Sequence, residues 1–444
     1  MILVSVFLSL ILALTAVTEA SSYWAAGSYA ASVFSLGEVS VLSCYQKELY
    51  ERYGIFGFHS DKETLETMVK NYASASFRED RSADRMVISL DSVTLYPEEF
   101  SLCKGDTLKK NMAECMKRQI PLEVLDWLGF QDALAGVFAG KTEGTASKGE
   151  GSEGNQASGG DGTEEDPYGF RTLRNSSVIE LLPSVRKPAE GALSTEIKLP
   201  QNLDDLVSNS ITEVLANLYV LSYFSNYTTE LQERTTFFRN EAEYVIAGEY
   251  SDEANLREVQ GYLTLLRTGL NALQIAEDPA KLEATMVLAA AISGPGAIWT
   301  QAAIVAGWAA AEALCDVSRL MQGKKVPIWK TEADWSLSIE GLRKWLVDGI
   351  EPETGDNGTE DTGKGLSYAE YLAILLFLTG SNLKLTRVMD LIQINLCGSS
   401  DGSFDLSRCY SGFRISCIWR QRERAFLPLN NQVRRYENTV TYFP

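Results

Sequence analysis

The sequence ILVSVFLSLILALTAVT, residues 2–18, contains no charged side chain. As a helix with a rise of about 1.5 Å per residue it would be roughly 25 Å long, slightly short of the apolar core of a bilayer. Glu19 follows, and a second uncharged run then includes Tyr23 and Trp24, residue types enriched at membrane–water interfaces. The pattern predicts one tilted or thinly matched membrane helix, with residues 1–22 as the anchor. The usual charge cue for orientation is absent, because no Lys or Arg precedes Lys47. We expect the head to lie outside the cytoplasm.

A cleaved signal peptide is the alternative interpretation. Thr18-Glu19-Ala20 places a small residue where cleavage would occur. A signal peptide also has a basic region before its apolar core, whereas no Lys or Arg precedes Lys47. We therefore favour a retained anchor, in which Glu19 either reaches water at the helix end or pairs with an amine of a neighbouring subunit inside the bilayer.

Helix-compatible sequence continues beyond the apolar segment, because no proline occurs before Pro97. Apolar and aromatic residues recur every three or four positions at Leu42, Tyr45, Leu49 and Tyr53. Gly54 is suited to end such a helix, which would be roughly 78 Å long. We expect residues 23–58 to form a helical stalk; the alternative is two helices broken near Gly27 or Gly37.

Two strands are predicted far apart in the chain. Residues 83–96, ADRMVISLDSVTLY, alternate in part between apolar and polar side chains and are followed by Pro97. Near the C-terminus, apolar residues alternate with mostly polar ones at Phe413, Ile415, Cys417 and Trp419. We expect both ends of the chain to meet in one small antiparallel sheet, with residues 59–140 as an α/β part of the head.

The rest of the chain is expected to be helical, apart from two polar segments. Residues 141–166, KTEGTASKGEGSEGNQASGGDGTEED, offer almost no apolar surface and predict a disordered acidic Gly/Ser linker. A second acidic loop covers residues 351–365. We expect residues 167–350 to form a helical bundle and residues 351–444 to add C-terminal helices and a final strand. The predicted fold class is α+β, mainly α, with a long N-terminal helix, a small antiparallel sheet and a large helical head.

Two segments of the bundle have distinctive patterns. Leu256, Val259, Leu263, Leu266 and Leu270 form an apolar stripe at helical spacing. Residues 284–311 are uncharged, but Gly294-Pro295-Gly296 divides them. We interpret the two pieces as buried helices of a soluble bundle rather than as a re-entrant or spanning segment. Residues 366–396 predict two further helices, divided near Gly380.

The segment EAEYVIAGEY, residues 241–250, is predicted to be a structural joint rather than a binding groove. Tyr244 can bury its ring while its hydroxyl keeps a polar partner. Arg239 and Glu243 are spaced to pair on a helix. Gly248 is suited to end that helix.

Charge and motif content argue against several function classes. The net charge of -19 disfavours binding to nucleic acid phosphates and to anionic lipid. His59 is the only histidine, and the sequence has no nucleophile elbow, dinucleotide-binding fingerprint or P-loop. Carboxylate pairs such as Asp204-Asp205 and Glu360-Asp361 fit solvated faces, and residues 355–361 lack the EF-hand spacing for calcium. The sequence therefore predicts no catalytic, cofactor-binding or metal-binding residues and no small-molecule substrate.

Seven cysteines give an odd number, so at least one thiol is unpaired or bonds between chains. Cys103 and Cys115 flank a short loop and are candidates for a local disulfide. Two of Cys397, Cys409 and Cys417 are candidates for another. The equally weighted alternative is small buried hydrophobic residues.

Several segments together resemble one protein family. In order along the chain they are VFLSLIL (6–12), YQKELYERYGIF (45–56), EAEYVIAG (241–248), Asn255-Leu256, Arg267, GKKVPIWK (323–330), LSYAEYL (366–372) and MDLIQIN (389–395). They are similar to a family of unknown function encoded beside Tad (tight adherence) pilus genes in Gram-positive anaerobes. The resemblance implies a TadE-like, pseudopilin-related envelope protein with a large head and no assigned catalytic residues. The sequence departs from the family in having no basic leader before the apolar run.

From these observations we expect a non-enzymatic structural or assembly component, minor-pilin-like, of a Tad-type pilus or secretion system. Its partners would be the membrane and other subunits, contacted through the N-terminal helix. The alternatives are a membrane-anchored adhesin-like binding protein and a cell-surface hydrolase.

Overall fold

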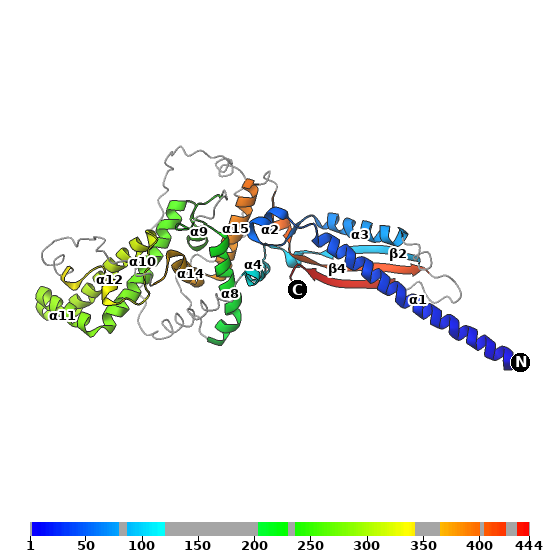
Figure 1. Cartoon of the computed structure of the whole chain (residues 1–444), viewed down its shortest axis with the longest axis horizontal. Coiled ribbons are helices and arrows are strands. Elements are labelled where there is room, and N and C mark those ends of the chain that lie inside the picture. The colour runs from blue at the N-terminus through cyan, green and yellow to red at the C-terminus, as the bar shows by residue number, and fades with distance from the viewer. Residues whose placement is uncertain are drawn as a thin grey trace.

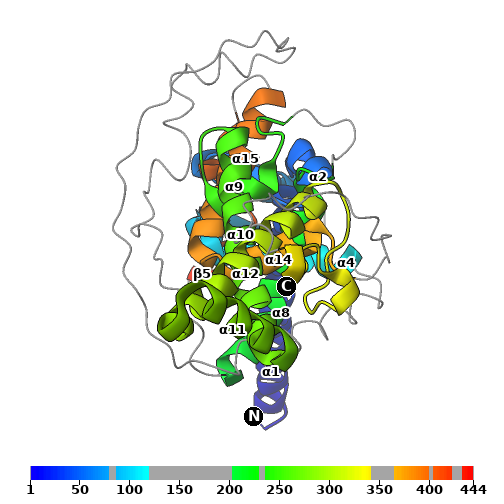
Figure 2. The ribbon, with the colours of Figure 1, turned by 90° about the vertical axis from the view of Figure 1, so that its left-hand side faces the viewer.

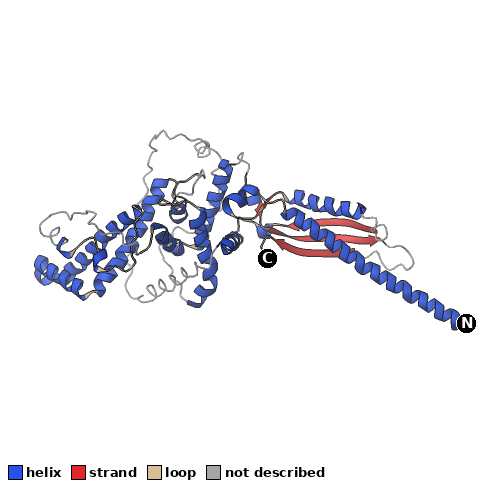
Figure 3. Ribbon diagram, in the orientation of Figure 1, coloured by secondary structure: helices blue, strands red, loops and turns tan. Residues whose placement is uncertain are grey.

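The N-terminal helix α1 (Ile2–Leu42) projects from one end of an elongated molecule (Figure 1). The computed structural model describes residues 2–79, 87–119, 203–229, 236–341, 365–399, 404–422 and 433–443. Three strands lie beside the second half of α1, and the larger part of the chain is a helical body (Figure 3). The α+β, mainly helical fold class predicted from the sequence is confirmed.

The other described helices are α2 (Lys47–Tyr53), α3 (Lys62–Glu79), α4 (Gly105–Gln119), α8 (Leu203–Tyr223), α9 (Glu241–Ala247), α10 (Asp252–Glu277), α11 (Pro279–Ser293), α12 (Ala297–Met321), α14 (Tyr368–Leu378) and α15 (Ser381–Ser399). Short 3-10 turns are η1 (Glu98–Phe100), η4 (Gly294–Gly296), η5 (Glu332–Asp334) and η6 (Leu406–Arg408). The described strands are β1 (Phe58–His59), β2 (Val87–Tyr96), β3 (Cys409–Tyr410), β4 (Gly412–Arg422) and β5 (Val433–Thr441).

Helix α1 is shorter than predicted. It ends at Leu42, so the expectation of one helix reaching Tyr53 is wrong, and no break occurs at Gly27 or Gly37. The chain leaves the helix because Tyr45 forms an antiparallel bridge with Phe58. Backbone pairing with a distant segment therefore ends the helix in the absence of proline.

A second helix, α2, follows this turn. It ends at Gly54, which has a φ of 64° in the left-handed region, as predicted for a helix-ending glycine. The predicted stalk is thus divided at the turn between α1 and α2.

The ends of the chain meet in one antiparallel sheet, as predicted. Its strand order is β2-β4-β5, with Val93 opposite Cys417 and Cys417 opposite Tyr436. The alternating residues of β4 all point into the core: Phe413, Ile415, Cys417 and Trp419. Strand β5 was not predicted. Strands β1 and β3 form a second, two-stranded sheet.

The second half of α1 belongs to the core of this α/β unit. Ala26, Ala30 and Phe34 are fully buried, and they pack in one cluster with residues of α3 and the sheet. Phe34 contacts Phe77 of α3 edge-on at 5.9 Å and Tyr436 of β5 at 5.2 Å between ring centroids. This part of the predicted stalk is therefore packed against the head.

The helical body is built around a large core shared by α2, α4, α8, α9, α10, α12, α14 and α15. The predicted division of residues 284–311 is confirmed, since α11 ends before η4 and α12 begins after it. Their predicted burial holds for one side only: Ile304 and Trp308 face a small core, whereas Ile298 and Trp299 are 72% and 84% exposed. The α11–α12 hairpin lies at the end of the molecule opposite the N-terminus (Figures 1 and 2).

Candidate functional site

The first half of α1 presents its apolar side chains to the surroundings. Leu3 is 84% exposed, Phe7 62% and Leu14 66%, and Ala26 is the first buried residue among those described. At about 1.5 Å per residue, the projecting segment is roughly 35 Å long, enough for the apolar core of a bilayer. Helix α1 is therefore a candidate membrane span by length and composition, and a signal sequence would pass the same test.

Arg434 of β5 fixes the point where α1 enters the body. Its guanidinium carbon lies 3.9 Å from the ring centroid of Tyr23 and 4.7 Å from that of Trp419. Its Nη1 also donates a 2.9 Å hydrogen bond to the carbonyl oxygen of Tyr23. Gly27 leaves room for this group, because a Cβ there would lie 2.7 Å from Nη2 of Arg434. Tyr23 and Trp24, predicted at a membrane interface, thus lie at the junction between projecting helix and head.

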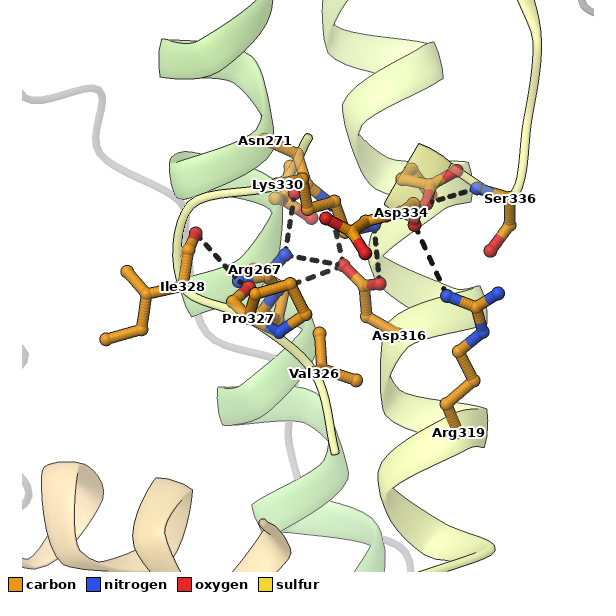
Figure 4. A network of polar contacts seen from close by, with 12 residues as sticks. Arg267, Asn271, Asp316, Arg319, Val326, Pro327, Ile328, Lys330, Asp334 and Ser336 are labelled. Atoms are coloured by element: carbon orange, nitrogen blue, oxygen red, sulfur yellow. Dashed lines mark hydrogen bonds and ion pairs between the residues drawn. The ribbon is translucent and has the colours of Figure 1, made fainter. Parts of the chain in front are cut away.

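Four charged side chains form a buried network between α10, α12 and the segment that follows α12 (Figure 4). Arg267 donates from Nε to Oδ2 of Asp316 at 2.9 Å, and Lys330 Nζ lies 2.6 Å from Oδ1 of the same carboxylate. Lys330 also pairs with Glu312. All four side chains are fully buried. Two cations and two anions make the set neutral, which offsets the large cost of removing each charge from water.

The buried charge network also holds backbone segments together. Nη1 of Arg267 donates to three further oxygens, namely the carbonyls of Pro327 and Ile328 and the hydroxyl of Tyr371. Glu312 accepts from the backbone N–H groups of Ser336 and Leu337 at 2.8 Å each. Burial raises the pKa of Tyr371 to about 12, although Arg267 opposes this, so its hydroxyl stays protonated at neutral pH. These contacts join α10, α12, α14 and the chain after α12, which is a structural role.

The carboxylates of α9 form a second buried group. All seven residues of this helix are buried. Glu241 accepts from the Ser225 N–H at 3.0 Å and from the Asn395 amide at 2.6 Å. Glu243 accepts from the Tyr227 N–H at 2.9 Å and from the Tyr368 hydroxyl at 2.8 Å. Burial raises the pKa of both carboxyls, and these hydrogen bonds oppose the rise.

The predicted joint at α9 is held from α15. Tyr244 is buried and its hydroxyl donates to Oδ2 of Asp390 at 3.0 Å, as expected for a buried tyrosine with a polar partner. Arg387 donates to the last three carbonyls of α9, those of Val245, Ile246 and Ala247. A cation here also suits the negative end of the helix dipole. Gly248 ends the helix with a φ of 78°, which confirms the predicted stop.

The extent of α9 does not support the predicted pair between Arg239 and Glu243. The helix begins at Glu241, so Arg239 lies outside it, and the helical spacing assumed for an Arg239–Glu243 pair does not apply. The backbone N–H of Arg239 instead donates to Asp252.

The remaining candidate residues are dispersed. His59 lies in strand β1 and stacks on Phe404, with 6.1 Å between the ring centroids. Burial and Arg408 lower its pKa. Asp204-Asp205 lie near the start of α8. Glu360-Asp361 and residues 355–361 lie outside the described residues, as does the linker at 141–166.

The candidate disulfides are not formed, and all seven cysteines are free thiols. Cys115 Sγ lies 3.2 Å from the hydroxyl of Tyr223 rather than bonding to Cys103. Cys397, Cys409 and Cys417 are buried thiols, which matches the alternative of small hydrophobic residues. Burial raises the pKa of all three. Within the described parts of the chain, no group of three or more His, Cys, Asp or Glu side chains could hold a metal ion.

The role of Arg267 was not predicted, although the sequence contained a signal for it. This residue lies four positions after Leu263 and three before Leu270, on the stripe that was assigned to the core. An arginine at such a position needs buried carboxylate or carbonyl partners.

Comparison with known proteins gives one match. The model of a family of unknown function (DUF5702) matches residues 171–420, more than half of the chain. No curated protein and no solved structure matches it. The matched residues include α9, the buried charge network and most of β4, but not α1.

Proposed function

Because the chain belongs to the DUF5702 family, whose function is unknown, we propose its role from the arrangement of its parts. The proposal is a membrane-anchored extracytoplasmic structural or assembly component, minor-pilin-like, of a Tad-type pilus or secretion system. The observation that supports it best is that one continuous helix is exposed and apolar in its first half and packed into an α/β unit in its second half. Pilin-like subunits share this plan.

The mechanism follows from what each half of α1 can contact. The exposed side chains of Phe7, Leu10 and Leu14 can pack against lipid or against the same helix of another subunit. The junction at Arg434 and Tyr23 holds the projecting helix at a fixed point of the sheet. Subunits joined through their helices would therefore also align their heads.

The buried polar groups support a structural rather than a catalytic role. Glu312 and Asp316 bind Lys330, Arg267 and backbone N–H groups, and Glu241 and Glu243 bind amide and hydroxyl donors. These carboxylates are engaged in holding helices together, so none of the four supports a cell-surface hydrolase. An adhesin-like binding protein remains the second proposal, because the α11–α12 hairpin presents exposed apolar residues at the far end of the molecule.

Site-specific photo-crosslinking in cells that carry the pilus machinery tests the leading proposal. We expect the full chain to stay in the membrane fraction after an alkaline wash and its head to be cleaved by external protease. A crosslinker at Leu10 should give adducts with other subunits of the assembly, whereas one at Tyr250, 81% exposed on the head, serves as the control position. Release by the wash, or adducts at Leu10 with lipid alone, would contradict the proposal.

A further inference from the structure

The α11–α12 tip, defined as residues 284–311, exposes a large apolar surface. Four of its bulky side chains face outward: Val287 is 65% exposed, Ile292 49%, Ile298 72% and Trp299 84%. No charged residue occurs in the tip. Several large apolar side chains exposed on one uncharged hairpin mark a candidate site of interaction.

The polar side chains of the tip are hydrogen-bonded to other groups of the α11–α12 hairpin. The hydroxyls of Ser293 and Thr300 lie 2.7 Å apart, and Ser293 also donates to the carbonyl of Ala289. Thr285 donates to the carbonyl of Leu282, and Gln301 donates to the same carbonyl. These hydroxyl groups and the amide nitrogen of Gln301 therefore find hydrogen-bond partners without water or a second protein.

This arrangement favours lipid over a protein partner. A protein interface surrounds its apolar centre with a polar rim that bonds to the partner. In hydrocarbon, by contrast, each unsatisfied polar group costs several kcal/mol, so polar groups must be satisfied internally. Helix α12 is also long and apolar enough to cross a membrane. Trp299, beside the turn, is a residue type that suits the interfacial region.

The dimensions fit a shallow insertion. The uncharged part of α11, residues 284–293, is about 15 Å long, half the thickness of a bilayer core. The hairpin therefore has a length that suits entry into one leaflet and return. It lies at the opposite end of the molecule from the projecting half of α1 (Figure 1). We propose that the α11–α12 tip inserts into a lipid bilayer other than the one that holds α1, so that the chain tethers two membrane surfaces.

Flotation tests this tethering. The full chain is reconstituted through α1 into phosphatidylcholine nanodiscs and mixed with protein-free phosphatidylcholine vesicles. The vesicles are zwitterionic because the chain carries a net charge of -19. We expect the wild-type nanodiscs to float with the vesicles. The double variant Ile298→Ser, Trp299→Ser should bind at least about tenfold less, because it removes two large apolar side chains from the inserted surface. Both residues are more than 70% exposed, so the fold should persist.

The matched control removes apolar surface elsewhere. The double variant Leu265→Ser, Tyr250→Ser changes residues that are 71% and 81% exposed outside the tip, and it should float like the wild type. Equal flotation of all three chains, or no flotation of the wild type, overturns the proposal. Nanodiscs that pair with each other through the tip without vesicles would identify a second copy as the partner and overturn it too.

The tip and α1 have separate readouts. Entry into nanodiscs, followed by size exclusion, reports on α1 and hence on the anchoring in the proposed function. A chain that does not enter nanodiscs is floated with vesicles directly. The tip variant is still expected to lose binding there, and the proposal is wrong if it does not.

Discussion

A Cβ atom at Gly248 would lie 2.3 Å from Nη2 of Arg387, the guanidinium that binds the last carbonyls of α9. The same glycine has a φ of 78°, a backbone angle that residues other than glycine rarely adopt. Two independent constraints, one of backbone conformation and one of space, therefore require glycine at the end of α9.

The substitution Gly248→Ala should lower the free energy of unfolding by about 2–4 kcal/mol, because it strains the backbone and displaces Arg387 from its carbonyls. Gly323→Ala is the matched control: its φ is 79°, but its Cβ would meet no atom within 4 Å. That variant should cost only the backbone term of about 1–2 kcal/mol. Equilibrium guanidinium unfolding of the full chain in detergent measures both. Equal losses would show that contact with Arg387 adds nothing.

Removing the charge of Lys330 should be strongly destabilising. In Lys330→Met, Glu312 and Asp316 stay buried without their shared cation, and breaking a buried pair in this way costs about 3–5 kcal/mol. Lys47→Met removes an exposed pair with Glu51 and should change stability by less than about 1 kcal/mol. Thermal unfolding compares the two variants. A small effect at Lys330 would mean that the network is open to water.

Glu243 should make stability fall as pH rises above its ordinary pKa. The unfolded chain ionises this carboxyl near 4.5, whereas burial raises its pKa in the folded chain. Between those two pKa values the unfolded state binds fewer protons, so the free energy of unfolding decreases with pH. Glu243→Gln should flatten this slope, since it removes the ionisation and keeps an oxygen for Tyr227 and Tyr368.

Glu213 provides the opposite sign in the same titration series. Burial alone would raise its pKa, but Lys384 and Lys109 outweigh burial and lower it. Its contribution to stability is lost as pH falls below 4.5, and Glu213→Gln should flatten that acid limb. Unfolding curves across pH for the wild type and the two variants test both signs. A slope unchanged by Glu243→Gln would contradict the burial of an ionisable group there.

Truncation of Tyr244 tests whether α9 is a structural joint. Tyr244→Ala should cost about 3–5 kcal/mol, by analogy with buried phenylalanine truncations. Tyr244→Phe should cost less, about 1–3 kcal/mol, because only the hydrogen bond to Asp390 is lost. Thermal unfolding measures both. Wild-type stability of Tyr244→Ala combined with lost partner binding would identify a recognition site instead.

Features with a local signal could be predicted from the sequence. The alternation before Pro97 and around Cys417 identified β2 and β4, and both ends of the chain proved to share a sheet. Gly294-Pro295-Gly296 separated α11 from α12 because the backbone there cannot continue a helix. The helix stop at Gly248 was likewise visible from residue type alone.

Features set by contacts between separate segments of the chain could not be predicted from the sequence. Helix α1 ends at Leu42 because Tyr45 pairs with Phe58, and nothing local marks that end. Strand β5 lies at the edge of the sheet and carries mostly polar residues, so it lacks apolar alternation. Residue type alone does not identify buried charges, and Arg267 and Lys330 are buried with partners from other segments.

The packing of α1 has a mechanical consequence. Tension between the membrane and the helical body would enter at the N-terminus, run along α1 and leave through the turn into α2. The sheet and α3 pack alongside the second half of α1, so extending that half requires it to shear away from the sheet (Figure 1). The first half is not supported in this way. Under tension outside the bilayer, the first half would therefore stretch before the second. The hydrogen bond from Arg434 to the carbonyl of Tyr23 marks the boundary between the compliant and the stiff part of the helix.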